Sequence, residues 1–171
     1  HFGHHKSQDV LEGYQNIIRC LNDVLSSWKG KAKLLIENQA GDHGSMGMTL
    51  DESVKVRQLA DYPEKIGFCL DTCHLFAAGG WDISNTGELL ARGKSLGYWD
   101  SLVAVHLNDS KYGAGSRKDR HARVGQGMIG TEALKHLALA QELTGKAFVL
   151  ESEKGADGTH REDIAKVLSW S

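Results

Sequence analysis

Four apolar segments of the sequence each end in a side chain that can bind a metal ion. The segments are KAKLLIEN, KIGFCLDT, LVAVHLND and KAFVLES, and their end residues are Glu37, Asp71, His106 and Glu151. Neighbouring segments are far enough apart for a strand, a crossover helix and two loops. A carboxylate or imidazole is costly to bury unpaired, so each end residue is expected to be a ligand or a catalytic group. In parallel α/β folds such groups converge at the carboxyl ends of the strands, and the sequence predicts a site there.

Helical periodicity fills the intervals between these segments. The apolar residues from Val10 to Trp28 follow one face of an α-helix, which Ser7 can cap and Gly30 can end. Four more helices are expected: from Asp51 to about Tyr62, from about Thr86 to Leu96, from Thr131 to Leu143 and from Arg161 to Trp170.

The alternation of strands and helices predicts one α/β domain over residues 1–171, and a (β/α)₈ TIM barrel is preferred to an open sheet. The chain supplies about four to five βα units, so a partial barrel is expected. Two connections are expected to be irregular, a Gly-rich turn at 77–80 and a polar, basic loop at 108–130. A partial barrel leaves two sheet edges unpaired, and the isolated chain is therefore expected to be poorly stable or to self-associate.

Composition excludes several classes of partner. The net charge is −2, so nothing global attracts nucleic acid or an anionic membrane, and no apolar stretch approaches the ~20 residues of a membrane span. Cys20, Cys69 and Cys73 lack the spacing of a disulfide scaffold, which favours a reducing, cytoplasmic location. Cys69 is expected to be a small buried hydrophobe, and Cys73 is left unassigned. Nine histidines are many for this length and suggest metal binding.

Two short motifs add further candidate ligands. In DTCH, Asp71 and His74 lie where a strand becomes a loop, although an Asp that caps a helix and a buried structural His would give the same pattern. In DRH, Asp119 and His121 are two residues apart and share a face in extended backbone, although a solvated loop explains them equally well.

Basic side chains surround the DRH motif. Such a cluster is usually a hydrated loop, but beside a metal centre it also suits contacts with backbone phosphates. The glycines of the loop do not form a nucleotide-binding fingerprint, since no strand immediately precedes them and no GK[ST] follows. The basic residues are Lys111, Arg117, Lys118, Arg120 and Arg123.

Taken together, the candidate ligands favour a centre with more than one ion. They mix carboxylates with imidazoles, which suits zinc, with manganese or iron as alternatives. They are too numerous for a single ion, and clustered ions are an established means of phosphoester hydrolysis. The set is Glu37, Asp71, His74, His106, Asp119, His121 and Glu151.

Five segments of the chain resemble the endonuclease IV family of apurinic/apyrimidinic endonucleases. The resemblance is collinear over essentially the whole chain and implies a TIM barrel with three zinc ions that incises double-stranded DNA 5′ to an abasic site. It implies catalytic roles for Glu37, Asp71 and Glu151. The segments are IENQAG (36–41), GFCLDTCHLFAAG (67–79), HLNDSK (106–111), GSRKDRHARVGQGMIG (115–130) and LES (150–152).

The resemblance also implies a distribution of the ligands. Glu37 is expected to bridge two ions, one of which is completed by Asp71, His106 and Glu151. The remaining site is expected to contain Glu37 and His1, which resembles the first histidine of the family's H-x-G-S-H segment, with His4 where Ser is usual. A third ion is expected to be held by His74, Asp119 and His121.

One of these sites is expected to be incomplete. The family takes a further histidine for it from an earlier strand, which has no counterpart here, and the N-terminal strands of the barrel are expected to be missing. This interpretation therefore includes a weakly active or inactive form of the enzyme. Two alternatives stay open: a metal-dependent sugar isomerase of the related barrels, which typically binds fewer ions and lacks the DRH pair, and a non-catalytic half-barrel.

Overall fold

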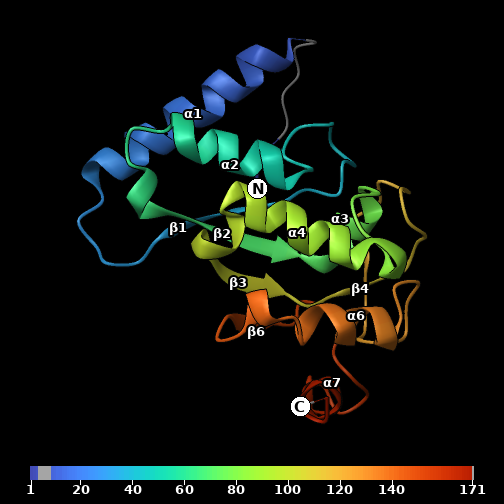
Figure 1. Ribbon diagram of the computed structural model, residues 1–171. Coiled ribbons are helices and arrows are strands. Elements are labelled where there is room, and N and C mark those ends of the chain that lie inside the picture. The colour runs from blue at the N-terminus through green and yellow to red at the C-terminus, as the bar shows by residue number, and fades with distance from the viewer. Residues whose placement is uncertain (4–8, 171) are drawn as a thin grey trace.

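The fold is built on a four-stranded parallel sheet. The computed structural model describes residues 1–3 and 9–170. Within that part of the chain the strand order is β1-β2-β3-β6, and every neighbouring pair is parallel. In Figure 1, helices α1 and α2 lie beyond the β1 end of the sheet, and α6 and α7 lie toward the β6 end. The strands are β1 (Leu34–Glu37), β2 (Ile66–Asp71), β3 (Leu102–His106) and β6 (Ala147–Val149).

The five predicted helices are confirmed, and several are shorter than predicted. The side chain of Asp9 caps the first helix by accepting from the N–H groups of Leu11 and Glu12, while the predicted cap, Ser7, lies outside the described residues. Thr49 and Glu52 form a capping box at the start of the second helix. The helices are α1 (Val10–Ser27), α2 (Leu50–Leu59), α4 (Thr86–Leu96), α6 (Thr131–Ala138) and α7 (Arg161–Leu168).

Strand β2 is the centre of the core. All six of its residues are buried, as expected for a parallel strand that is covered on both faces. The ring of Phe68 stacks on that of Tyr98 with 4.5 Å between centroids, and both rings are buried. Because β2 is buried along its whole length, Asp71 at its carboxyl end is also inaccessible to solvent.

Three short elements lie where irregular connections were predicted. Helix α3 (Thr72–Ala77) begins directly after β2, so the predicted turn at 77–80 follows a helix rather than the strand. Strands β4 (Asp109–Ser110) and β5 (His121–Ala122) pair antiparallel inside the predicted loop at 108–130. This pair, which we call the β4–β5 ribbon, carries one of the DRH residues.

The described sheet is open, as predicted for a partial barrel. Among the described residues, β1 pairs with β2 alone and β6 with β3 alone. The parallel strands joined by helices agree with the predicted α/β architecture. In the described part of the chain, no helix has both the length and the apolar character needed to span a bilayer.

Candidate metal centre

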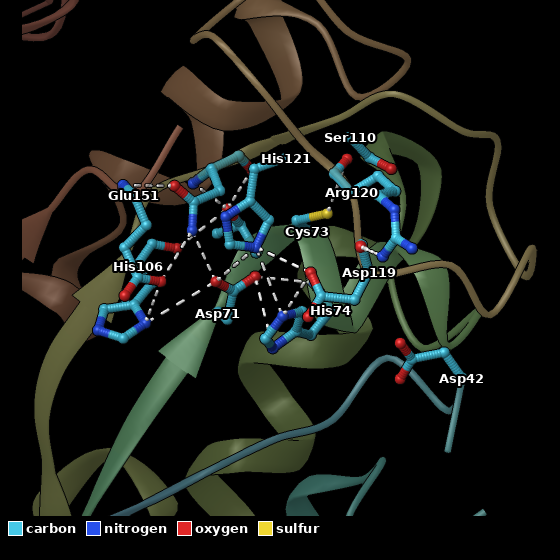
Figure 2. Close-up of polar contacts among 12 residues, drawn as sticks. Asp42, Asp71, Cys73, His74, His106, Ser110, Asp119, Arg120, His121 and Glu151 are labelled. Carbon is cyan, nitrogen blue, oxygen red and sulfur yellow. Dashed lines mark hydrogen bonds and ion pairs between the residues drawn. The ribbon is translucent and has the colours of Figure 1, made fainter. Parts of the chain in front are cut away.

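Three of the predicted ligands are the last residues of neighbouring parallel strands. Glu37 ends β1, Asp71 ends β2 and His106 ends β3, and the register places Asp71 directly beside His106. Glu151 follows β6 by two residues, so it lies in a loop rather than in the strand. Figure 2 shows Asp71 in the middle of the group, with His106 and Glu151 on one side of it.

The first cluster consists of Glu37, Asp71, His106 and Glu151. Each offers one ligand atom, and these atoms lie within 4.8 Å of one another. The Nδ1 atom of His106 lies 3.1 Å from Oε1 of Glu37, 2.9 Å from Oε2 of Glu151 and 3.8 Å from Oδ2 of Asp71. Three carboxylates therefore converge on one imidazole nitrogen, at a point where a cation would neutralise them.

The second cluster consists of His74, Asp119 and His121. Oδ1 of Asp119 lies 3.2 Å from Nε2 of each histidine, and the two Nε2 atoms are 3.4 Å apart. His74 comes from α3, whereas His121 comes from β5 and Asp119 from the loop before it. Figure 2 shows this cluster on the other side of Asp71 from His106. The structure therefore brings the DTCH and DRH motifs together.

A third group links His1 to the other two clusters. Nε2 of His1 lies 3.1 Å from Oε2 of Glu37, and His1, Glu37 and His74 offer ligand atoms within 4.8 Å of one another. Glu37 thus belongs to both the first cluster and this group. The His1 side chain is 52% exposed, whereas that of His74 is 2% exposed, so this group opens to solvent.

Two asparagines that the sequence analysis did not single out hold the carboxylates in place. Nδ2 of Asn108 donates to Oδ2 of Asp71 at 2.7 Å, and Oδ1 of Asn108 accepts from the N–H of Glu151 at 2.9 Å. Asn38 makes two hydrogen bonds to the Asp71 main chain. The available signal was position: Asn38 directly follows one strand-end ligand, and Asn108 lies two residues after His106.

Two cysteine thiols lie against the clusters. Cys69, buried as expected, offers its sulfur within reach of Glu37 and His106, and Cys73 lies similarly close to Asp71 and His121. Burial raises the pKa of the Cys73 thiol to about 12, so it is a protonated neighbour at neutral pH rather than a thiolate.

Burial and neighbouring charges change the pKa values of several titratable groups in the centre. Burial raises the pKa of Asp71, and the nearby His74 and His121 offset part of that effect. Burial lowers the pKa of His74, but the hydrogen bond to Asp119 and the surrounding carboxylates outweigh it and raise the value to about 9. Hydrogen bonds to Cys69 and Glu37 raise the pKa of His106 to about 11.

The donor atoms of the centre are grouped closely enough to fit divalent cations. Hydrogen bonds from both histidines of the second cluster hold the pKa of Asp119 well below its usual range. The buried carboxylates are thus balanced by protons on imidazoles, which is the balance that a bound cation would replace. Nitrogen and oxygen donors in groups of three and four suit zinc, manganese or iron.

The basic side chains near the centre divide into two kinds. Lys111 pairs with Glu153 at 2.6 Å, and Arg123 pairs with Glu162 and Asp163. These two stabilise the loop itself. The other three lie on the exposed part of the loop: Arg117, Lys118 and Arg120.

The fold and the centre define a TIM-barrel protein with a cluster of carboxylate and imidazole ligands at its strand ends. A family model described as "Xylose isomerase-like TIM barrel" matches residues 1–170, and the chain belongs to that family.

Within the family, the resemblance to endonuclease IV is confirmed. The chain is 38% identical over 169 residues to the probable endonuclease 4 of Symbiobacterium thermophilum, covering 99% of this chain and 61% of that protein. It is 37% identical over 171 residues to the probable endonuclease 4 of Thermotoga maritima, and the match covers 98% of this chain and 58% of that protein. The crystal structure of endonuclease IV from Thermus thermophilus superposes on this chain with a TM-score of 0.77 and 32% sequence identity. The match covers 98% of this chain and 58% of that structure. The chain thus spans about three fifths of the length of these relatives.

Proposed function

We propose that this chain carries the metal centre of a phosphodiesterase that incises DNA 5′ to abasic sites. The observation that carries the proposal is the convergence of two ligand clusters on either side of the buried Asp71. Similarity to proteins named endonuclease 4 supports DNA as the substrate. The three cysteines are free thiols, which agrees with a cytoplasmic location.

The ligands would divide between three ions, with zinc preferred and manganese as the alternative. His74, Asp119 and His121 would hold one ion, and Glu37 would share in the other two. One of those would be completed by the rest of the first cluster, and the other by His1, which leaves it with the smallest donor set. When bound, such ions would polarise a phosphodiester, acidify water and neutralise the charge of the leaving oxygen.

The carboxylates of the chain have different tasks in this proposal. Asp71 is inaccessible and both of its carboxylate oxygens accept hydrogen bonds, from the His74 N–H and from Asn108, so it orients the centre. The Glu151 side chain is 41% exposed, so it would be the carboxylate of the first cluster that a water can reach for proton transfer. Glu37 belongs to the first cluster and also groups with His1 and His74, so it would be shared between ions.

Exposed cations of the basic loop would hold the DNA backbone. Arg117, Lys118 and Arg120 lie within three residues of Asp119 in the sequence, so their charges flank the second cluster. Contacts of this kind are independent of sequence and weaken with salt. They suit a substrate whose recognition depends on a missing base rather than on a base sequence.

The direct test is incision of a duplex with one abasic site by the purified, zinc-loaded chain. We expect a nick on the 5′ side of that site and none in the same duplex without the lesion. Asp71→Asn should lower the rate by more than about 100-fold, beyond the usual effect of a ligand's hydrogen-bond partner. The exposed Glu88→Gln is the matched control and should leave the rate unchanged. If neither zinc nor manganese supports incision while a full-length endonuclease IV is active, the proposed activity is wrong for this chain.

A sugar isomerase is the alternative function within the same barrel family. The second cluster weighs against it, since an isomerase centre typically has no use for His74, Asp119 and His121 beside the first cluster. Elemental analysis of the chain and of His121→Ala separates the two: three ions per chain, or two of which this variant loses one, favour the nuclease, and a count that the variant leaves unchanged favours the isomerase.

A further inference from the structure

The described structure contains one more buried carboxylate beside the metal centre, and it is not among the predicted ligands. Asp109 on β4 is fully inaccessible. Its two oxygens accept hydrogen bonds from five main-chain N–H groups at 2.8 to 3.3 Å. The donors are Ser110, Gly125, Gly127, Ile129 and Gly130.

Hydrogen bonds to a charged acceptor are stronger than neutral ones, and a ring of them offsets the cost of burying the charge. The segment 125–130 is shaped for this contact. A Cβ atom on Gly127 would lie 2.5 Å from Oδ1 of Asp109 and 2.4 Å from the carbonyl oxygen of Ser110. Gly125 and Gly130 have φ angles of +74° and +81°, which favour glycine. The segment therefore wraps around the Asp109 carboxylate.

The same residue belongs to the ribbon that carries the second cluster. In the β4–β5 ribbon, Asp109 is opposite Ala122 and Ser110 is opposite His121. The N–H of Lys111 donates to the carbonyl of Arg120 at 2.9 Å, which extends the pairing toward Asp119. Two of the three residues of the second cluster thus depend on this ribbon, whereas His74 is fixed by α3.

We propose that Asp109 is a positioning residue for the second cluster. Its carboxylate locks segment 125–130 against β4, and the locked ribbon holds Asp119 and His121 within reach of His74. The inference rests on the proposed metal centre and deepens it, because it names the residue that builds one of its sites without touching an ion.

The test is cobalt(II) binding to the full chain, followed by absorbance and by competition with a chelator. His121→Ala identifies the signal of the second cluster. Asp109→Asn keeps the shape of the side chain but replaces one acceptor oxygen by an N–H donor. We expect it to weaken cobalt binding at the second cluster by about 10- to 100-fold, as for other partners of metal ligands, and to leave the first cluster unchanged. Leu25→Ala in α1 is the control for general destabilisation, since Leu25 is buried in the core.

Gly127→Ala provides the second variant if Asp109→Asn does not fold, because its methyl group would press on the same carboxylate. Hydrogen exchange of the unmodified chain is independent of both variants: cobalt should slow exchange at the N–H groups of Gly127 and Gly130. The role of Asp109 would be overturned if the variants bound cobalt at the second cluster as tightly as the unmodified chain does. It would also be overturned if cobalt did not change the exchange rates of the Gly127 and Gly130 N–H groups. Failure of the unmodified chain to bind cobalt would instead overturn the proposed metal centre.

Discussion

The side chain of Asp71 has two roles, because it caps a helix and is also a candidate metal ligand. One carboxylate oxygen accepts from the His74 N–H and so caps α3, and the other accepts from Asn108. Oδ1 also lies 3.8 Å from Nδ1 of His74, and Oδ2 lies 3.8 Å from Nδ1 of His106 and 3.6 Å from Nε2 of His121. Because the residue is inaccessible, its orientation depends on these partners rather than on solvent.

Substitution of Asn108 should therefore weaken metal binding at the first cluster without unfolding the chain. Asn108→Ala removes the donor to Asp71 and the acceptor for the Glu151 N–H. We expect zinc affinity at the first cluster to fall by about 10- to 100-fold, with little change at the second cluster. Isothermal titration calorimetry measures both. Asn22→Ala on α1 is the control, because Asn22 accepts from the N–H of Asp61. Equal losses in the two variants would contradict the role given to Asn108.

The pKa shifts predict how stability depends on pH. The pKa of His74 is about 9 in the folded, metal-free chain, against about 6.5 for an unperturbed histidine. The raised pKa contributes stability that is fully present below about pH 6.5 and is lost as the pH rises through 9. His106, with a pKa of about 11, extends the loss to higher pH. Urea unfolding midpoints of the metal-free chain should therefore fall between pH 7 and 9, and His74→Gln should flatten that fall.

Bound metal should reverse the dependence of folding stability on pH. The histidines must give up their protons to bind an ion, so zinc affinity should rise with pH over the same interval. The zinc-saturated chain should then gain stability, relative to the metal-free chain, as the pH increases. Parallel denaturation curves with zinc and with a chelator give the comparison. A gap that narrows with pH would contradict the proton balance described above.

At the scale of the elements, the strands were predictable because each is part of a short apolar run, and β2, which is buried along its whole length, is a continuous one. The strand ends of β1, β2 and β3 coincide with the predicted ligands. Helix α3 was missed because it has only six residues, too few to show a helical period. The β4–β5 ribbon was missed because each strand has two residues in a glycine-rich loop.

The supporting residues of the centre were harder to predict than its ligands. The strand-end position singles out Glu37 and Asp71 from the sequence alone. Asn38, Asn108 and Asp109 acquire their roles from contacts with residues distant in the sequence, such as the pairing of Asn108 with Asp71. An Asn or Asp after a strand is equally typical of an ordinary turn, so residue type alone did not distinguish a turn residue from one that supports the ligands.

Helix α4 offers a matched pair of glycines that tests packing within one element. A Cβ atom on Gly93 would lie 2.3 to 2.5 Å from the indole of Trp99, whereas one on Gly87 would have open space. Gly93→Ala should lower the free energy of unfolding by about 1–3 kcal/mol through overpacking. Gly87→Ala should raise it by up to about 1 kcal/mol, since alanine favours the helix. Chemical denaturation of both variants measures the difference, and a stabilised Gly93→Ala would contradict the packing of α4 against α5 (Tyr98–Ser101).

At the scale of the whole molecule, the candidate metal centre lies at the carboxyl ends of β1, β2 and β3, which belong to the open sheet that Figure 1 shows. Strands β1 and β6 each have one described neighbour, so each presents an edge with main-chain groups available for pairing. Val103 on β3 is 39% exposed and Val149 on β6 is 44% exposed. Apolar side chains and unpaired strand edges therefore occur together at the β6 side of the sheet.

This combination predicts that the isolated chain self-associates. Its mass is 18.7 kDa, and light scattering should give a larger value that increases with protein concentration. The apparent melting temperature should rise with concentration for the same reason, because association stabilises the folded chain. Val149→Lys places a charge on the β6 edge and should shift the chain toward the monomer. Ile83→Lys changes an exposed apolar residue outside the sheet and should leave the mass unchanged. A proven monomer with a sharp melt at every concentration would show that the open edges are tolerated in water.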